Sequence, residues 1–265
     1  MPGNAAVKST ARVIMKKLWP QLIACTFLIM ACFFVGIYAL SAFGLLLGDN
    51  AVFASLPFFV LYVLFVAAPF VYGALRFVWR AGDDSGDDVG LVFYYFASAK
   101  RYFKSVRFTV GFLIRIALML FLAYLPQNVV KVALYAASGF LNEQMRLQFS
   151  FVVSLLGLLG LVLFVILSAR YYIAPLLFVG CDHLENAEVI HMSKLISRKT
   201  AGAYIVLVLG MIGWMLLSLL VITLIYTVPY FLAAYTVHCR YAVYHYNHLA
   251  KISGETDFPA FRSSF

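Results

Sequence analysis

The stretch FSFVVSLLGLLGLVLFVILS, residues 149–168, contains no charged side chain and opens the apolar run Phe149–Val179. About 20 such residues, wound as a helix, are enough to cross the hydrocarbon core of a bilayer. Comparable runs occupy most of the chain, at Gln21–Leu47, Val52–Trp79, Phe108–Leu125, Ala203–Thr227 and Pro229–Leu249. The sequence therefore predicts an all-α, polytopic transmembrane helix bundle of about six spans.

Composition agrees with this fold class. The chain has 265 residues, of which 64% are hydrophobic and 12% charged, whereas about a quarter of the residues in a soluble domain are charged. No stretch outside the apolar runs is long enough to bury a core of its own. We therefore divide the chain into a basic cytoplasmic segment, residues 1–20, a membrane domain, residues 21–250, and a polar cytoplasmic tail, residues 251–265.

The distribution of Lys and Arg orients the membrane domain. The turn at residues 48–50 has none, whereas the segment before the first run carries Lys8, Arg12, Lys16 and Lys17. Basic residues return after the second and fourth runs, and positively charged loops stay on the cytoplasmic side. Six spans then leave both termini in the cytoplasm. Because the basic residues crowd the ends of apolar runs, we expect anionic membrane lipids as partners and no nucleic acid.

A basic amphipathic segment leads into each pair of spans. The three segments are residues 14–19, 99–104 and 193–199, and each predicts a short interfacial helix on the cytoplasmic side. They represent either a threefold internal repeat or the basic loops common to membrane proteins, and the sequence leaves both interpretations open. On the opposite side, residues 127–148 predict a helix that rests on the outer face.

Prolines interrupt the returning spans at Pro69, Pro175 and Pro229. A proline in a bilayer frees a carbonyl that a hydroxyl, a water or a neighbouring helix must satisfy. We expect Pro69 to kink the second span and Pro229 to open the sixth. The second half of the sixth run contains the polar residues His238 and His245. This run therefore either spans the membrane or is a hydrated helix that lies in the membrane–water interface.

Arg115 is the best candidate for a ligand-binding residue. It falls near the middle of the third run, where a charged side chain costs about 3 kcal/mol or more. All acidic residues lie in loops, lead-in segments or the tail. Arg115 therefore either binds an anion, such as the phosphate or carboxylate of a substrate or lipid, or satisfies itself on backbone carbonyls freed by a kink. Arg76 and Arg170 lie near the inner boundary, and we interpret them as snorkelling anchors.

Signals for other chemistry are weak. The acidic and histidine residues after the fourth run are Asp182, His183, Glu185, Glu188 and His191. They do not match a zinc motif, which needs three or four convergent ligands, and Asp182 with Glu185 fits a helix capping box. The 4 cysteines show no CxxC spacing, and no nucleophile or phosphate-loop motif is present. We therefore expect no metal, no cofactor, no disulfide and no enzymatic activity.

A set of residues in the last third of the chain carries a family resemblance. Its members are Ser193, Lys194, Gly213, Trp214, Pro229, Tyr230 and Tyr244. This set resembles the signature of a bacterial integral membrane family catalogued as domain of unknown function nine-seven-five. Tyr72-Gly73-Ala74 is also similar to the middle portion of that family, and the resemblance covers roughly residues 10–250.

The resemblance has limits and few consequences. The chain departs from the family in its long outer segment and in having Tyr244-His245-Tyr246 where a Phe-Tyr pair is typical. The family implies a multi-span protein of the bacterial plasma membrane. It supplies no activity and no catalytic residues.

Three hypotheses for function follow, of which the third, an intramembrane enzyme that uses the cluster Asp182–His191, predicts a bound metal. The first is a non-enzymatic membrane protein that binds or transports an anionic small molecule or lipid, with Arg115 as its anchor. The alternative is a structural or accessory subunit whose protein partner, or a second copy of the chain, supplies the carboxylate that the membrane domain lacks.

Overall fold

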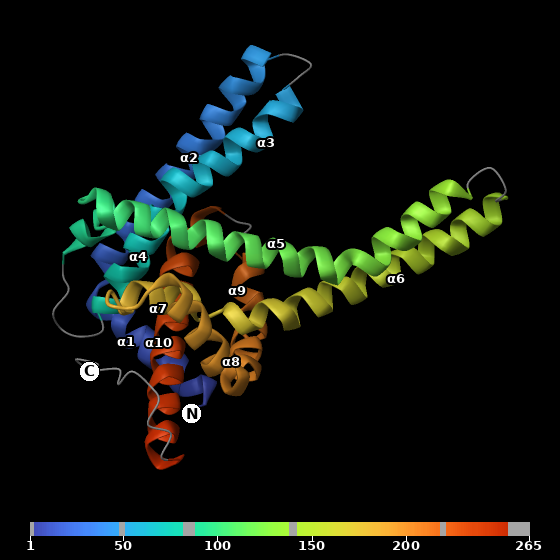
Figure 1. Cartoon of the computed structure of the whole chain (residues 1–265). Coiled ribbons are helices and arrows are strands. Elements are labelled where there is room, and N and C mark those ends of the chain that lie inside the picture. The colour runs from blue at the N-terminus through green and yellow to red at the C-terminus, as the bar shows by residue number, and fades with distance from the viewer. Residues whose placement is uncertain (1–2, 48–50, 82–87, 138–141, 218–220, 254–265) are drawn as a thin grey trace.

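The computed structural model describes residues 3–47, 51–81, 88–137, 142–217 and 221–253. Within these ranges every regular element is a helix, and no strand occurs (Figure 1). Two long helical hairpins extend away from a body of shorter and later helices, in two directions. The all-α fold class predicted from the sequence is confirmed.

The basic N-terminal segment forms a separate amphipathic helix. α1, Asn4–Lys17, has one face of residues spaced by four, and its buried residues are Val7, Ala11 and Met15. The helix ends at Leu18, and α2, Trp19–Leu47, follows at once. The second residue of α2 is a proline, which a first helical turn tolerates because its N–H has no helical partner.

The first hairpin returns through a helix that changes its winding. Its elements after α2 are α3, Ala51–Tyr62; the π-helical turn η2, Val63–Ala67; and α4, Ala68–Ala81. This π-helical turn ends two residues before Pro69, where the sequence predicts a kink. Pro69 cannot donate to the carbonyl of Phe65, and the Tyr102 hydroxyl donates to that oxygen instead, at 2.8 Å.

The second hairpin is longer. Its elements are α5, Ala99–Ala136, and α6, Glu143–Ser168, followed by the short 3-10 turn η5, Ala169–Tyr171, and by α7, Ala174–Gly180. α5 has 38 residues, so it is about 57 Å long, roughly twice the hydrocarbon thickness of a bilayer. The separate outer helix expected at residues 127–148 is instead a continuation of α5 as far as Ala136. Residues 138–141 of that segment lie outside the described residues.

The last apolar runs fold differently from the prediction. α8 spans Asn186–Leu209, α9 spans Ile212–Leu217, and α10 spans Val221–Ser253. The fifth run, Ala203–Thr227, is therefore interrupted at Gly210 and Met211, and its residues 218–220 lie outside the described residues. α8 ends where the amides of Gly210 and Met211 bond back to carbonyls of its last turn. The predicted tail lies outside the described residues from residue 254 onward.

Four stretches are long and apolar enough to cross a membrane, within the described residues. They are Trp19–Ala42, Pro57–Ala81, Ala99–Ala136 and Leu147–Gly180. These correspond to the first four predicted spans. The predicted fifth and sixth spans are not among these stretches, and residues 218–220 of the fifth lie outside the described residues. Pro229 lies inside α10 and does not open it, contrary to the prediction.

The predicted interfacial helices are only partly present. α1 is separate, but residues 99–104 are the opening turns of α5 and residues 193–199 lie inside α8. Extending a helix already started adds one hydrogen bond for each residue fixed, whereas starting a new one is costly. Nothing in these two lead-ins breaks the helix. At the α1–α2 junction, by contrast, Pro20 lacks the N–H needed to continue one.

α4 lies at the centre of the body, because both hydrophobic clusters use it. One cluster joins α4 to α5, α7, α8 and α10, and the Phe108 and Phe178 rings stack in it with centroids 4.3 Å apart. The other joins α4 to α1, α2 and α10. The 3-10 turn η3, Val89–Phe93, lies against α4 at Gly73. A Cβ on Gly73 would stand 1.9 Å from the Val92 carbonyl oxygen, so only glycine allows this approach.

Candidate functional site

Arg115 is partly buried on α5 and turns back along its own helix. Its Nη1 donates to the Gly111 carbonyl at 2.6 Å. Helical side chains point toward the N-terminus of their helix, so the guanidinium lies nearer the basic end of α5 than its Cα does. The absent Gly111 side chain leaves this space open, since a Cβ there would be 3.2 Å from Nη1. The carbonyl used is not freed by a kink, because the proline within α5 is Pro126.

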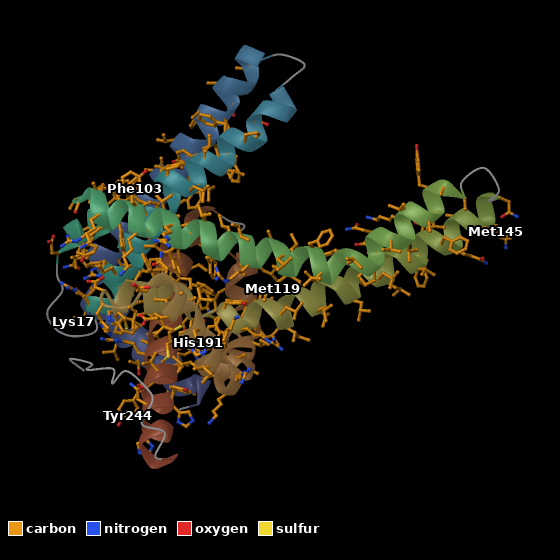
Figure 2. The ribbon with its side chains drawn as sticks, in the orientation of Figure 1. Lys17, Phe103, Met119, Met145, His191 and Tyr244 are labelled. Atoms are coloured by element: carbon orange, nitrogen blue, oxygen red, sulfur yellow. The ribbon has the colours of Figure 1, made fainter. Side chains whose placement is uncertain are left out.

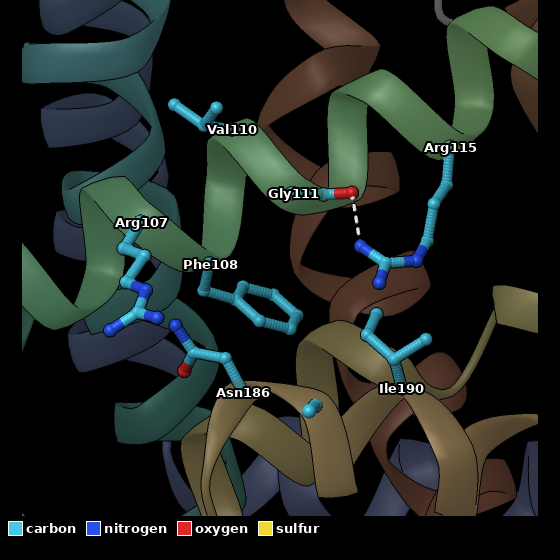
Figure 3. A pocket seen from close by; sticks show the side chains of 8 residues that line it. Arg107, Phe108, Val110, Gly111, Arg115, Asn186 and Ile190 are labelled. Carbon is cyan, nitrogen blue, oxygen red and sulfur yellow. Dashed lines mark hydrogen bonds between the residues drawn. The ribbon is translucent and has the colours of Figure 1, made fainter.

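A cavity of about 320 Å³ separates this face of α5 from the first turns of α8. Figure 3 shows Arg107 and Arg115 extending from α5 toward Asn186 and Ile190 of α8. The full lining is Arg107, Phe108, Val110, Gly111, Arg115, Asn186, Ala187 and Ile190. Its volume lies within the range of small-molecule sites, roughly 300–1,000 Å³.

The cavity is cationic. Arg107, Gly111 and Arg115 are spaced by four residues and so share one face of α5. Its lining contains no carboxylate among the described residues. A guanidinium has five N–H donors, and within the described part of the chain Arg115 makes one hydrogen bond. Two such groups with apolar walls are suited to a phosphate or carboxylate, which arginine binds in a bidentate manner.

Arg76 is held by an ion pair that the sequence did not predict. Its side chain is 5% exposed and donates from both terminal nitrogens to the Asp182 carboxylate, at 2.7 and 2.6 Å. Nη1 also donates to the Val179 carbonyl at 3.0 Å, and the guanidinium carbon lies 3.7 Å from the centre of the Tyr94 ring. The interpretation of Arg76 as a snorkelling anchor is wrong, because the side chain is buried in the body and paired with Asp182.

This Arg76–Asp182 clasp joins four elements. The Tyr94 hydroxyl, just after η3, donates to Asp182 Oδ2 at 3.1 Å, and Lys104 Nζ of α5 donates to the Asp182 carbonyl at 2.8 Å. Burial raises the pKa of Asp182, but the hydrogen bonds and charge of Arg76 outweigh it, so the pKa lies below its ordinary value. The clasp therefore stays charged at neutral pH and ties α4, η3, α5 and the end of α7 together.

The acidic and histidine residues after α7 are spread over the segment between α7 and α8 and the start of α8. No group of three or more His, Cys, Asp or Glu side chains converges among the described residues. The capping box also differs from the prediction. It is formed by Glu185 and Glu188, with the Glu185 amide donating to the Glu188 carboxylate at 2.8 Å. Asp182 is unavailable as a cap because Arg76 holds its carboxylate.

His238 lies in the core and not at a wet interface. It is fully buried, and its Nε2 is 3.3 Å from the Tyr172 hydroxyl. The same hydroxyl is 2.8 Å from Thr200 Oγ1, and Tyr235 donates to the Tyr172 carbonyl at 2.5 Å. These contacts join α8 and α10 through the segment before α7. The interfacial interpretation is wrong for this part of α10, because α10 packs against α1, α2, α4 and α8.

The family-like residues of α8 serve contacts with η5. Ser193 is fully buried and donates to the Arg170 carbonyl at 3.3 Å. Lys194 is exposed, with Nζ 5.5 Å from the centre of the Tyr171 ring. The Arg170 residue itself is exposed. Both signature residues therefore fix the junction between the second hairpin and α8.

The remaining family-like residues form no common site. Trp214 and Tyr230 meet with ring centroids 6.1 Å apart, and Pro229 is buried beside Tyr230 in α10. Gly213 is exposed with open space around it, and Tyr244 is 66% exposed on the far half of α10 (Figure 2). None of these residues lines the cationic cavity. Within the signature, Ser193, Pro229 and Tyr230 are buried, whereas its other four residues are exposed.

Fold and composition define the class: an all-helical protein with four helices long and apolar enough to cross a membrane, within the described residues. The chain belongs to the family described as "Protein of unknown function (DUF975)", whose model matches residues 1–245. The resemblance predicted from the sequence is confirmed. No curated protein and no solved structure matches the chain.

Proposed function

We propose that this protein binds an anionic small molecule or lipid head group in the cavity between α5 and α8, and that it does so without catalysing a reaction. The observation that carries the proposal is the lining of the cavity, which holds Arg107 and Arg115 and no carboxylate among the described residues. Two arginines facing one cavity repel each other, and an anion between them removes that cost.

The position of the cavity suits a ligand that arrives at the membrane surface. Arg107 lies one residue before the third apolar run, and Asn186 is the first residue of α8. Both are at the polar ends of their helices. Arg115 lies deeper, but its side chain points back toward that end, as its bond to Gly111 shows. An anion held there keeps its charge near the aqueous boundary, which limits the cost of burial.

We also propose a topology, in which α8, α9 and α10 form a third membrane hairpin in a bacterial plasma membrane. Four or six crossings both leave the two termini on one side, and positive loops favour the cytoplasm. Thr10 of basic α1 and Tyr241 of α10 have their hydroxyls 3.4 Å apart, which supports a cytoplasmic second half of α10.

The two long hairpins diverge in Figure 1, so crossing one bilayer together requires a rotation where η2 or η5 joins the body. Reporter fusions at the two termini test the orientation, and a periplasmic signal from either end would refute it.

Native mass spectrometry in the membrane lipids of the protein tests the binding proposal. We expect a specific anionic adduct on the wild type that is lost in Arg115→Leu. The matched control is Arg198→Leu, since Arg198 is an exposed arginine of α8 outside the cavity. An adduct that survives in Arg115→Leu, or that disappears equally in both variants, would refute the site.

The second candidate function, an accessory subunit, rests on the same arginines. A partner, or a second copy of the chain, would supply a carboxylate to Arg115 where this chain supplies none among the described residues. Side chains project outward along the α5–α6 hairpin (Figure 2). Apolar ones among them, such as Leu158 and Leu159 of α6 at 62% exposed, face either lipid or such a partner. A stoichiometric protein partner in the same mass spectra, released by Arg115→Leu, would favour this candidate over a small anion.

A further inference from the structure

A second cavity lies beside the first, and its character is different. Its volume is about 410 Å³, and α5, α6, η5 and α8 wall it. Most of its lining is apolar or aromatic, with Phe112 and Ile116 from α5 and Ile205 and Val208 from α8. Tyr172 and Tyr204 form a rigid part of the wall, because their rings stack with centroids 4.2 Å apart.

The two cavities adjoin along α5. Gly111 and Arg115 line the cationic cavity, and the residues that follow each of them, Phe112 and Ile116, line the apolar one. Successive helical residues are about 100° apart around the axis, so the two cavities occupy neighbouring faces of the same two turns. Both arginines, Arg107 and Arg115, line the first cavity, and within the described part of the chain no charged residue lines the second. Polarity therefore falls from the first cavity to the second.

We propose that the two cavities together hold one anionic amphiphile with a single alkyl chain: its phosphate or carboxylate between Arg107 and Arg115, and its chain against Phe112, Ile116 and Val208. This inference rests on the proposed function and names its ligand class. A free inorganic anion would use the first cavity alone. A ligand with an alkyl chain also fills the second cavity. When that cavity is empty, the apolar side chains of α5 and α8 that line it lack packing contacts on one side.

Shape, and not the hydrophobic effect, selects the chain. An alkyl chain in a bilayer is already in apolar surroundings, so moving it into the cavity gains packing contacts and little else. The stacked tyrosines fix the width of the cavity in advance, and a preformed wall reduces the ordering cost of binding. A bulkier side chain in the wall should therefore exclude the chain while leaving the head-group site intact.

The test measures binding of octyl phosphate and of inorganic phosphate to the full-length protein in neutral phosphatidylcholine nanodiscs. Val208→Trp fills the apolar cavity, and the matched control Val206→Trp adds the same bulk to an exposed position outside it. We expect Val208→Trp to weaken the binding of octyl phosphate about tenfold or more and to leave the binding of inorganic phosphate unchanged. Val206→Trp should change the affinity for neither probe. Retained phosphate binding shows that the variant is folded. If Val208→Trp loses it, the smaller change Val208→Phe replaces it.

Two other results have distinct meanings. If Arg115→Gln weakens both probes but Val208→Trp leaves octyl phosphate unchanged, the chain lies outside the cavity; the amphiphile inference then fails while the proposed anion site stands. If Arg115→Gln leaves both probes unchanged, the anion site itself fails, and the inference fails with it.

Discussion

Removing the two partners of the Arg76–Asp182 clasp one at a time should destabilise the fold unequally. The Arg76 side chain is 5% exposed, whereas that of Asp182 is 52% exposed. Asp182→Ala leaves a buried guanidinium with the Val179 carbonyl and the Tyr94 ring as its remaining partners. An unpaired buried charge costs about 3–5 kcal/mol. Because water already reaches the carboxylate side of this pair, we discount that range to about 2–3 kcal/mol.

The reverse deletion should cost less. Arg76→Met leaves a half-exposed carboxylate that water can hydrate and that the Tyr94 hydroxyl still contacts, and the methionine side chain fills most of the vacated volume. We expect a loss of about 1 kcal/mol, near the upper limit for an exposed ion pair. The two variants should therefore differ by roughly 1–2 kcal/mol, with Asp182→Ala the less stable.

Equilibrium unfolding in mixed micelles with increasing dodecyl sulfate, followed by tryptophan fluorescence, measures both free energies. The buried Trp79 lies one turn after Arg76 on α4 and should report the loss of packing. Arg80→Met is the control, since Arg80 is exposed on the same helix and should change stability by less than about 0.5 kcal/mol. Equal losses, or a larger loss for Arg76→Met, would show that the burial of Arg76 does not set the energetics of the clasp.

Three further predictions use the same unfolding measurement. The pKa of Asp182 is depressed in the folded protein. The ionised clasp should therefore stabilise the fold above the pKa of an unfolded aspartate, about 3.9, and lose that contribution as pH falls through the lower folded pKa. Unfolding measured against pH should show this loss in the wild type, and the same loss in Asp182→Asn would contradict the prediction. Gly73→Ala should destabilise by about 1–3 kcal/mol or more, because its Cβ meets the Val92 carbonyl. Gly202→Ala in α8, with open space around it, should stabilise by up to about 1 kcal/mol through helix propensity, and the same sign for both glycine variants in the unfolding assay would refute the packing argument.

Parts of the site were accessible to sequence reasoning and parts were not. Arg115 stood out because an arginine inside an apolar run is costly wherever the helix packs. The cavity around it did not, since Asn186 and Ile190 come from a helix far along the chain. Arg107 does not stand out in the sequence, because it is one of several basic residues between the second and third runs. Its spacing of eight residues from Arg115 was a usable signal, because that spacing puts both on one helical face.

The clasp shows why local patterns mislead at a boundary. Arg76 near the end of an apolar run and Asp182 at the start of a loop each have an ordinary local interpretation, as a snorkelling anchor and as a helix cap. Their pairing depends on α4 and α7 lying side by side, and no spacing along the chain encodes that. Once Arg76 takes the carboxylate, the capping box moves to Glu185 and Glu188.

The sequence by itself determined the helical class, four stretches long and apolar enough to cross a membrane, and the family, because run length, charge placement and proline position act locally and survive any packing. The tertiary structure alone decided which polar groups meet. It buried His238 beside Tyr172, joined Arg76 to Asp182, and interrupted the fifth apolar run at Gly210 and Met211. These outcomes depend on contacts between helices far apart in the chain, and their energies are set by burial and geometry that exist only after the helices have packed.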